Sequence, residues 1–328
     1  LLACRPRLES TFKILPTVSD YLDESEVAGQ IELSEKPDAA TRIDAMQKIN
    51  EPEIDETDLL LEVNDLQMHF PERSGFFSGP KGVVKAVDGI SFTVPRGSTL
   101  GLVGESGCGK TTTGRAILNL VEPTSGSVKF MGVEIAGRNA AAMLPLRKRM
   151  QIVFQDPYSS LNPRLTIEQA LTEPMAVHGI GSNHSDRRDR AAALLEEVNL
   201  ESHFLRRYPH EFSGGQRQRI CVARALSLEP EFIVCDEAVS AMDVSVQAQV
   251  LNLLKELQSR RNLTYIFISH DLSVVKFMAD TMAVMRAGKI MEQGRAESIY
   301  ANPAEDYTQR LIDAIPRDSV EFIKQRVA

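Results

Sequence analysis

Short apolar runs alternate along the chain with longer segments that are compatible with helices. The runs 99–103, 232–235 and 264–269 contain no charged residue. Such runs are typical of strands that are buried on both faces of a parallel sheet. The helix-compatible segments are 112–120, 167–177, 186–198 and 246–260. Strands that alternate with helices predict an α/β fold with a central, mostly parallel sheet.

An antiparallel part is predicted on the N-terminal side of this sheet. Segments 59–63 and 90–94 are strand-like, and Pro95, Arg96 and Gly97 form a turn after the second. Further strands are predicted at 127–130 and 151–154, and a hairpin at 282–285 and 289–293 that turns at Ala287 and Gly288.

The negative charge of the chain is concentrated near its N-terminus. The 328 residues have a net charge of −8, and thirteen acidic and three basic residues lie between Asp20 and Asp58. We therefore expect residues 9–56 to form an acidic linker or a poorly ordered arm, with a short helix at 43–49. The remainder from Leu59 on is close to neutral, which argues against a nucleic-acid partner.

Hydropathy and cysteine usage restrict the compartment. No apolar run of 18 residues is present, so we expect no transmembrane helix and no signal peptide, and any membrane role is peripheral. The four cysteines have neither metal-ligand spacing nor a paired framework, and we expect them to be small buried residues in a reducing cytoplasm. They are Cys4, Cys108, Cys221 and Cys235.

A glycine-rich loop with phosphate-binding spacing follows the run 99–103. Its residues are Gly104, Glu105, Ser106, Gly107, Cys108, Gly109, Lys110 and Thr111. The form G-x-x-x-x-G-K-[ST] between a strand and a helix surrounds an anion with backbone N–H groups and the positive end of the helix dipole. Lys110 supplies a point charge for the β- and γ-phosphates, and the Thr111 hydroxyl can bind Mg²⁺. The loop predicts a nucleotide site, against the alternative of a glycine-rich turn that matches by chance.

Further polar groups follow predicted strands or open helices. Asp236 and Glu237 follow the run 232–235, where open α/β sheets place ligand chemistry, and they suit a Mg²⁺ contact and a base that polarises water. Gln155 and His270 end two other strands. A second helix start with anion-binding geometry is formed by Ser213, Gly214, Gly215 and Gln216. Taken singly, His270 and Gln155 are ordinary polar residues, so the prediction depends on the whole set.

The order and spacing of these motifs resemble those of ATP-binding cassette (ABC) ATPases. GESGCGKT resembles the Walker A motif, FSGGQRQR the signature, and FIVCDE the Walker B motif, while VFQDP, SAMD and ISHD resemble the Q-, D- and H-loops. The resemblance implies an α/β P-loop NTPase of the ABC type, with a mostly parallel core sheet, an antiparallel β subdomain and a helical subdomain. It implies an ATPase domain at 57–328, with the helical subdomain at about 157–212 and a C-terminal extension at about 295–328.

The resemblance also implies a role for each site residue. The phosphates of ATP are held by Lys110, by the backbone amides of the loop and by Thr112. Glu237 activates the attacking water, Gln155 is a further catalytic residue, and His270 contacts the γ-phosphate. The residues that serve Mg²⁺ are Thr111, Gln155 and Asp236.

A second cassette is implied as a partner, because two cassettes pair head to tail around two ATP molecules. The partner is a second copy, a different cassette or a fused upstream half. Asp243 is expected to couple the two sites. The residues expected to act on ATP held by the partner are Ser213, Gly214, Gly215 and Gln216.

Finer features resemble the oligopeptide and dipeptide importer subfamily, namely VKAVDGISF at 84–92, QDPYSSLNPR at 155–164 and YTQRL at 307–311. This implies an ATPase that powers peptide transport through integral membrane permease subunits. The implied location is the cytoplasmic face of the membrane, with an extracytoplasmic solute-binding protein as a further partner. No cysteine follows Cys235, so nothing supports the iron–sulfur cluster of some members.

Two positions depart from the family pattern. The signature begins with Phe212 where the family usually has leucine. The aromatic residue that stacks on adenine is not identified, since its expected place holds 82–84, with Phe76 and Phe77 upstream.

Residues 1–7, LLACRPR, resemble the end of the same subfamily and this chain's own 311–317, LIDAIPR. We hypothesise that residues 1–8 are a remnant of a preceding cassette in a tandem protein, although a chance match stays open.

Two other functions are less compatible with the sequence. One is a non-transport cassette protein, such as a repair or translation ATPase; those usually carry long coiled-coil insertions or two complete cassettes with basic linkers, and this chain has neither. The other is a kinase or GTPase that uses the same phosphate-binding loop, but the segment SGGQ has no role in those proteins.

Overall fold

The computed structural model describes residues 13–15, 17, 22–27, 30–35, 54–71, 82–240 and 242–315, with the side chains of 22–27 and 30–35 left out. Several sequence predictions lie outside the described residues: the remnant at 1–8, the helix at 43–49, Cys4, Phe76 and Phe77.

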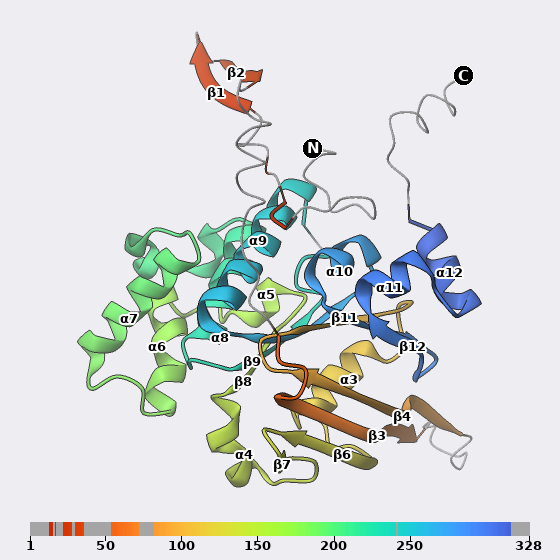
Figure 1. Cartoon of the computed structure of the whole chain (residues 1–328). Helices are drawn as coiled ribbons and strands as arrows, with labels where there is room; N and C mark the ends of the chain where they lie inside the picture. Colours follow the sequence, from red (N-terminus) through yellow and green to blue (C-terminus); the bar gives the residue numbers. More distant parts are fainter. Residues whose placement is uncertain are drawn as a thin grey trace, which may run out of the picture.

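The central sheet has six strands in the described part of the chain (Figure 1). Their order is β12 (Lys289–Arg295), β11 (Thr281–Arg286), β5 (Thr99–Val103), β10 (Thr264–Ser269), β9 (Phe232–Asp236) and β8 (Met150–Val153). Neighbours from β11 to β8 pair in parallel, and β12 is antiparallel to β11. All residues of β5, β9 and β10 are buried, as expected for central parallel strands. The predicted mostly parallel sheet is confirmed.

An antiparallel sheet forms the second layer. Its order is β4 (Val83–Pro95), β3 (Leu59–Pro71), β6 (Ser125–Phe130) and β7 (Val133–Glu134). Strand β3 extends beyond the predicted 59–63, because its pairing with β4 continues after an irregularity between Val63 and Leu66 that contains Asn64 and Asp65. Asp65 has a φ of 45°, and its N–H donates to the Ser91 hydroxyl at 2.9 Å. The predicted antiparallel part is confirmed, with longer strands.

Helices cover both faces of the central sheet (Figure 1). Helix α3 (Lys110–Ile117) contacts both sheets, with β9 and β10 on one side and β3 and β4 on the other. The remaining helices are α4 (Ala140–Arg147), α5 (Pro157–Ser160), α6 (Ile167–Val177), α7 (His184–Glu197), η2 (Ser202–Arg206), η3 (Pro209–Glu211), α8 (Gly214–Leu226), α9 (Val244–Arg261), α10 (Leu272–Met278), α11 (Ala296–Ala301) and α12 (Asp306–Asp313). Helices α6 and α7 stand at the side away from α11 and α12.

The buried apolar side chains form two clusters, one on each face of the central sheet. Alternate residues of β10 show the division, because successive side chains of a strand point to opposite faces. Tyr265 and Phe267 join the cluster with the helical segments, and Ile266 and Ile268 join the cluster with α3 and the antiparallel sheet.

One residue of the predicted linker lies in the helix-side cluster. The Leu15 side chain is fully buried. The Asn252 amide of α9 holds its backbone, accepting from Leu15 N at 2.8 Å and donating to Leu15 O at 2.6 Å. The acidic segment also contains an antiparallel pair, β1 (Leu22–Val27) and β2 (Gln30–Glu35), that was not predicted. The division at residue 57 stays a prediction.

Candidate functional site

The glycine-rich loop connects β5 to α3 and is curled tightly. Gly104 and Gly109 have φ values of 148° and 112°, which L side chains rarely adopt. A β-carbon on Gly104 would lie 2.2 Å from the Met285 carbonyl oxygen, and one on Gly109 would lie 2.1 Å from the Ala86 carbonyl oxygen. The loop therefore needs glycine at both positions. Its tight curl provides backbone N–H groups for an anion.

Lys110 lies inside this curl, and Thr112 follows it in the first turn of α3. The Lys110 side chain is buried, and its Nζ donates to Gly104 O at 2.8 Å and to Glu105 O at 2.9 Å. The loop thus concentrates one positive charge at the N-terminal end of a helix, where the helix dipole adds to it.

Thr111 and Asp236 meet at the carboxyl edge of the central sheet. Thr111 Oγ1 donates to Asp236 Oδ1 at 2.8 Å, although the two residues are 125 apart in sequence. Burial raises the pKa of the Asp236 carboxyl, and the hydrogen bond from Thr111 acts in the opposite direction. A hydroxyl and a carboxylate side by side are the oxygen ligands that a hard cation takes.

Glu237 is the centre of a second group at the same edge. Gln155 Nε2 donates to Glu237 Oε2 at 3.0 Å, and His270 Nδ1 lies 3.4 Å from the same oxygen. Glu237 has a φ of 49°, and Ile268 O accepts its N–H at 3.0 Å. The three side chains come from the ends of three neighbouring strands, β8, β9 and β10. The structure therefore brings together the three predicted catalytic residues.

The signature segment opens α8. Ser213 is its N-cap and forms a capping box with Gln216, while Gly214 and Gly215 form the first turn. A β-carbon on Gly215 would lie 2.2 Å from Val246 Cγ1 of α9. Among the described residues, no hydrogen bond or ion pair joins this segment to the loop at 104–111. The structure does not bring these two predicted anion sites together within one chain.

Asp243 caps the neighbouring helix. Its Oδ1 accepts from Ser245 N at 3.1 Å and from Val246 N at 3.0 Å, so the residue is the N-cap of α9. The departure at Phe212 is accommodated, because this side chain is buried and packs edge-on against Phe204 with ring centroids 5.4 Å apart.

The signature helix is coupled to the segment that carries Gln155. The Arg217 guanidinium lies 3.8 Å from the centroid of the Tyr158 ring, and its Nε donates to Pro209 O at 2.7 Å. Gln218 Nε2 donates to Phe154 O at 3.4 Å. These contacts connect α8 to the strand end that holds Gln155.

An exposed aromatic side chain beside the loop was missed by the sequence analysis. Phe70 is 41% exposed at the end of β3 and pairs directly with Val84 of β4, which is 52% exposed. Val84 is two residues from Ala86, whose carbonyl oxygen lies against Gly109. Phe70 continues the row of Leu66 and Met68, because every second residue of a strand shares a face. That row could be found only with the full extent of β3.

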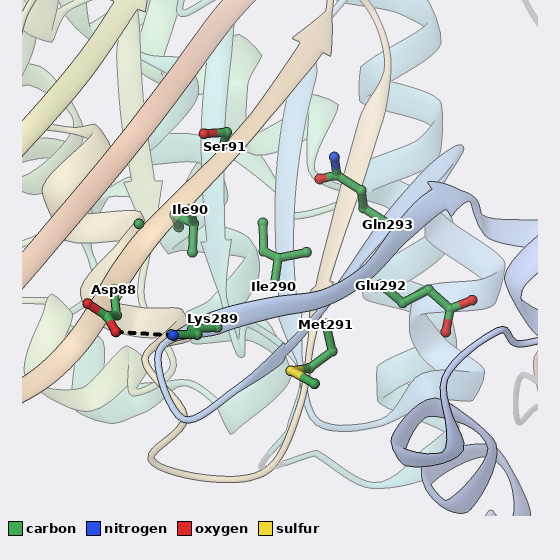
Figure 2. A pocket seen from close by; sticks show the side chains of 9 residues that line it. Asp88, Ile90, Ser91, Lys289, Ile290, Met291, Glu292 and Gln293 are labelled. Atoms are coloured by element: carbon green, nitrogen blue, oxygen red, sulfur yellow. Dashed lines mark ion pairs between the residues drawn. The ribbon is translucent and has the colours of Figure 1, made fainter.

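A pocket between β4 and β12 contains none of the predicted site residues. Figure 2 shows it between β4 and β12, with Lys289 directed toward Asp88 at 3.6 Å. Asp88 also pairs with Lys85 at 3.2 Å and His69 at 3.3 Å, and its pKa is lowered mainly by the hydrogen bond from Lys85. We interpret this cluster as a support for the strands, which connects β12 to β4.

Comparisons with known proteins assign the site to a family. The family model described as ABC transporter matches residues 87–240. The oligopeptide transport ATP-binding protein OppF of Bacillus subtilis (strain 168) is 49% identical over 272 residues, which are 83% of this chain and 87% of that protein. The chain belongs to the ABC transporter family. A putative peptide import ATP-binding protein of Brucella ovis is 51% identical over 257 residues, 78% of each chain.

Solved ABC cassettes have the same fold. The cassette MJ0796, in a dimeric post-hydrolysis state with ADP and Pi, is 25% identical with a TM-score of 0.64, over 72% of this chain and 98% of that one. CbiO1 of Clostridium perfringens, part of the ABC transporter complex CbiONQ, is 24% identical with a TM-score of 0.65, over 82% and 99%. The predicted ABC fold is confirmed.

Membership of the ABC family establishes the activity class. The chain is an ATP-binding and ATP-hydrolysing subunit of a transporter, and ABC cassettes dimerise and work with a membrane permease. In the ranges that the structure describes, no helix is both long and apolar enough to span a bilayer.

Proposed function

We propose that this chain powers the import of peptides or related solutes through an integral membrane permease. The names of its relatives, which state oligopeptide transport or peptide import, support the solute class. The observation that carries the ATP-hydrolysing part of the proposal is the meeting of two groups of side chains at one edge of the central sheet. Thr111 contacts Asp236 there, and Gln155 and His270 contact Glu237.

The loop from Gly104 to Thr112 would hold the phosphates of ATP. The curl at Gly104 and Gly109 leaves no room for side chains, which suits close approach of the backbone to an anion. Lys110 Nζ already lies against two loop carbonyl groups, so its charge is within reach of the β- and γ-phosphates.

Mg²⁺ would be held by Thr111 and Asp236, with Gln155 as a further ligand. The hydroxyl and carboxylate oxygens fit this cation, which prefers hard oxygen ligands. Gln155 uses its Nε2 toward Glu237, so its carbonyl oxygen can turn to the metal. When bound, the ion neutralises charge on the transferred phosphoryl group.

Glu237 would polarise the attacking water, and His270 and Gln155 would position it. Both neighbours contact Oε2, which restrains the carboxylate and allows Oε1 to accept a hydrogen bond from water. The hydrogen bond from Glu237 N to Ile268 O fixes the backbone of the base against the next strand.

Phe70 would stack on adenine. It is an exposed aromatic ring beside the loop, in a patch that also contains Val83 and Val84. A flat, exposed aromatic side chain suits the base of a bound nucleotide.

The signature would act in trans, on ATP held by a partner cassette. Its separation from the loop within one chain supports this arrangement, because an anion site at Ser213 would then serve a different nucleotide. The other residues of this surface are Gly214, Gly215, Gln216 and Asp243. The partner would be a second copy, a different cassette or a fused upstream half.

The further partners and the location follow from the proposed transport. The chain would lie on the cytoplasmic face of the membrane, with its helical subdomain at about 157–212 facing the integral membrane permease. An extracytoplasmic solute-binding protein would deliver the peptide. Residues 9–56 would link the domain at 57–328 to a remnant at 1–8, with 295–328 as the C-terminal extension.

Peptide uptake by cells tests this proposal. Cells without the gene are expected to lose uptake of a labelled oligopeptide, and the wild-type gene restores it. A gene that encodes Lys110→Ala should not restore uptake, because the phosphate charge is lost. Full peptide uptake in cells without the gene, together with loss of uptake of another solute, would refute the peptide assignment.

A further inference from the structure

Helix α12 places one tyrosine directly against the phosphate-binding loop. Tyr307 is 6% exposed, and the guanidinium group of Arg286 lies 4.8 Å from the centroid of its ring. The Tyr307 hydroxyl accepts a hydrogen bond from Glu105 N at 3.4 Å, across 202 residues of sequence. The C-terminal extension therefore reaches the second residue of the loop.

The backbone of Glu105 is held from two sides. Its N–H donates to the Tyr307 hydroxyl, and its carbonyl oxygen accepts from Lys110 Nζ at 2.9 Å. The Tyr307 hydroxyl, the Glu105 backbone and the Lys110 ammonium group thus form a series. We therefore expect a change at Tyr307 to alter the position of the carbonyl group that Lys110 contacts.

The end of β11 supports the same loop. Gly288 N donates to Cys108 O at 2.9 Å, just after Arg286. The Met285 carbonyl oxygen leaves no space for a β-carbon on Gly104. Tyr307 adds a contact from α12 to this support, and Arg286 connects β11 to α12 through its contact with the Tyr307 ring.

We propose that Tyr307 is a positioning residue for the phosphate-binding loop and for Lys110, so that α12 is part of the nucleotide site. The inference rests on the proposed role of Lys110 in phosphate binding. The Tyr307 hydroxyl contacts the loop, and the Tyr307 ring contacts Arg286. Its loss changes the affinity for ATP and leaves the chemistry at Glu237 intact.

The test is Tyr307→Phe in the assembled transporter, measured by ATP turnover and by titration with a fluorescent ATP analogue. This variant keeps the ring over Arg286 and removes the hydroxyl. We expect KM and Kd for ATP to rise about 3- to 10-fold, the range for one lost hydrogen bond, while kcat stays within about twofold. Tyr307→Ala should raise both further.

The matched control is Tyr300→Phe in α11. The Tyr300 hydroxyl donates to Leu272 O in α10, away from the loop. We expect no change of KM in this variant, although both variants lose one hydroxyl. An unchanged KM in Tyr307→Phe, or an equal rise in both variants, would overturn the inference. A wild-type protein that binds no ATP would instead refute the proposed function.

Discussion

Leu15 offers a quantitative test of how the N-terminal segment is attached. Its fully buried side chain lies in the helix-side core, far in sequence from the rest of that core. Replacing a buried leucine by alanine costs about 2–5 kcal/mol, from lost burial and the remaining cavity. Asn252→Ala removes two hydrogen bonds to the Leu15 backbone, which we expect to cost about 1–3 kcal/mol.

Urea unfolding of the full chain measures both variants. With an m-value of about 3 kcal/mol/M, the midpoint of Leu15→Ala should fall by about 1 M. The free energy of unfolding of the double variant should fall by about 0.5–3 kcal/mol less than the sum of the two single losses. The reason is that the hydrogen bonds to Asn252 require the segment that Leu15 anchors. Leu120→Ala is the control, since this leucine is 47% exposed, and its midpoint should stay near the wild-type value.

The reasoning would be refuted by a Leu15→Ala midpoint equal to that of the wild type. Such a result would mean that the segment around Leu15 does not pack on α9 in solution. Strict additivity of the two substitutions would refute the coupling between the side chain and the hydrogen bonds of Asn252.

Two further predictions concern nucleotide affinity and pH. Phe70→Ala should raise KM for ATP about 5- to 100-fold, because the stacking on adenine is lost. Val133→Ala, which changes an exposed residue on β7, is the control and should leave KM unchanged. Equal ATP affinities of Phe70→Ala and the wild type in a titration would remove Phe70 from the site. Burial raises the pKa of the Cys221 thiol to about 11, so the folded protein keeps a proton that the unfolded chain releases above its ordinary pKa of about 8.5. The contribution of the Cys221 thiol to the free energy of unfolding is therefore fully present below pH about 8.5 and is lost as the pH rises to about 11. Urea midpoints across that window should fall less steeply for Cys221→Ala, and equal slopes would contradict this.

The central strands could be predicted from sequence because burial on both faces determines their composition. Strands β5 and β10 have the predicted bounds, since every position is apolar or small. Strand β3 was predicted too short, because Asn64 and Asp65 disfavour strands and only the pairing with β4 and β6 carries the chain through the irregularity. The short helices α10 and α12 were not predicted as separate elements.

The residue types of the site could be predicted, but their contacts could not. Asp236 and Glu237 are visible at the end of a buried run, whereas the contacts of Thr111 with Asp236 and of Gln155 with Glu237 depend on strand order. Tyr307 lies in the segment YTQRL that resembles the importer subfamily, but its contact with the loop could not be predicted, because it spans 202 residues of sequence.

The most direct test of the account is ATP turnover by Glu237→Gln in the assembled transporter. Glu229→Gln is the matched control, because Glu229 precedes the same strand and has a similar φ of 53°, but pairs with Arg190 at 3.3 Å on the surface. We predict that Glu237→Gln lowers turnover by about 100-fold or more and retains ATP binding, while Glu229→Gln turns over like the wild type. Undiminished turnover by Glu237→Gln would contradict the assignment of this residue as the base.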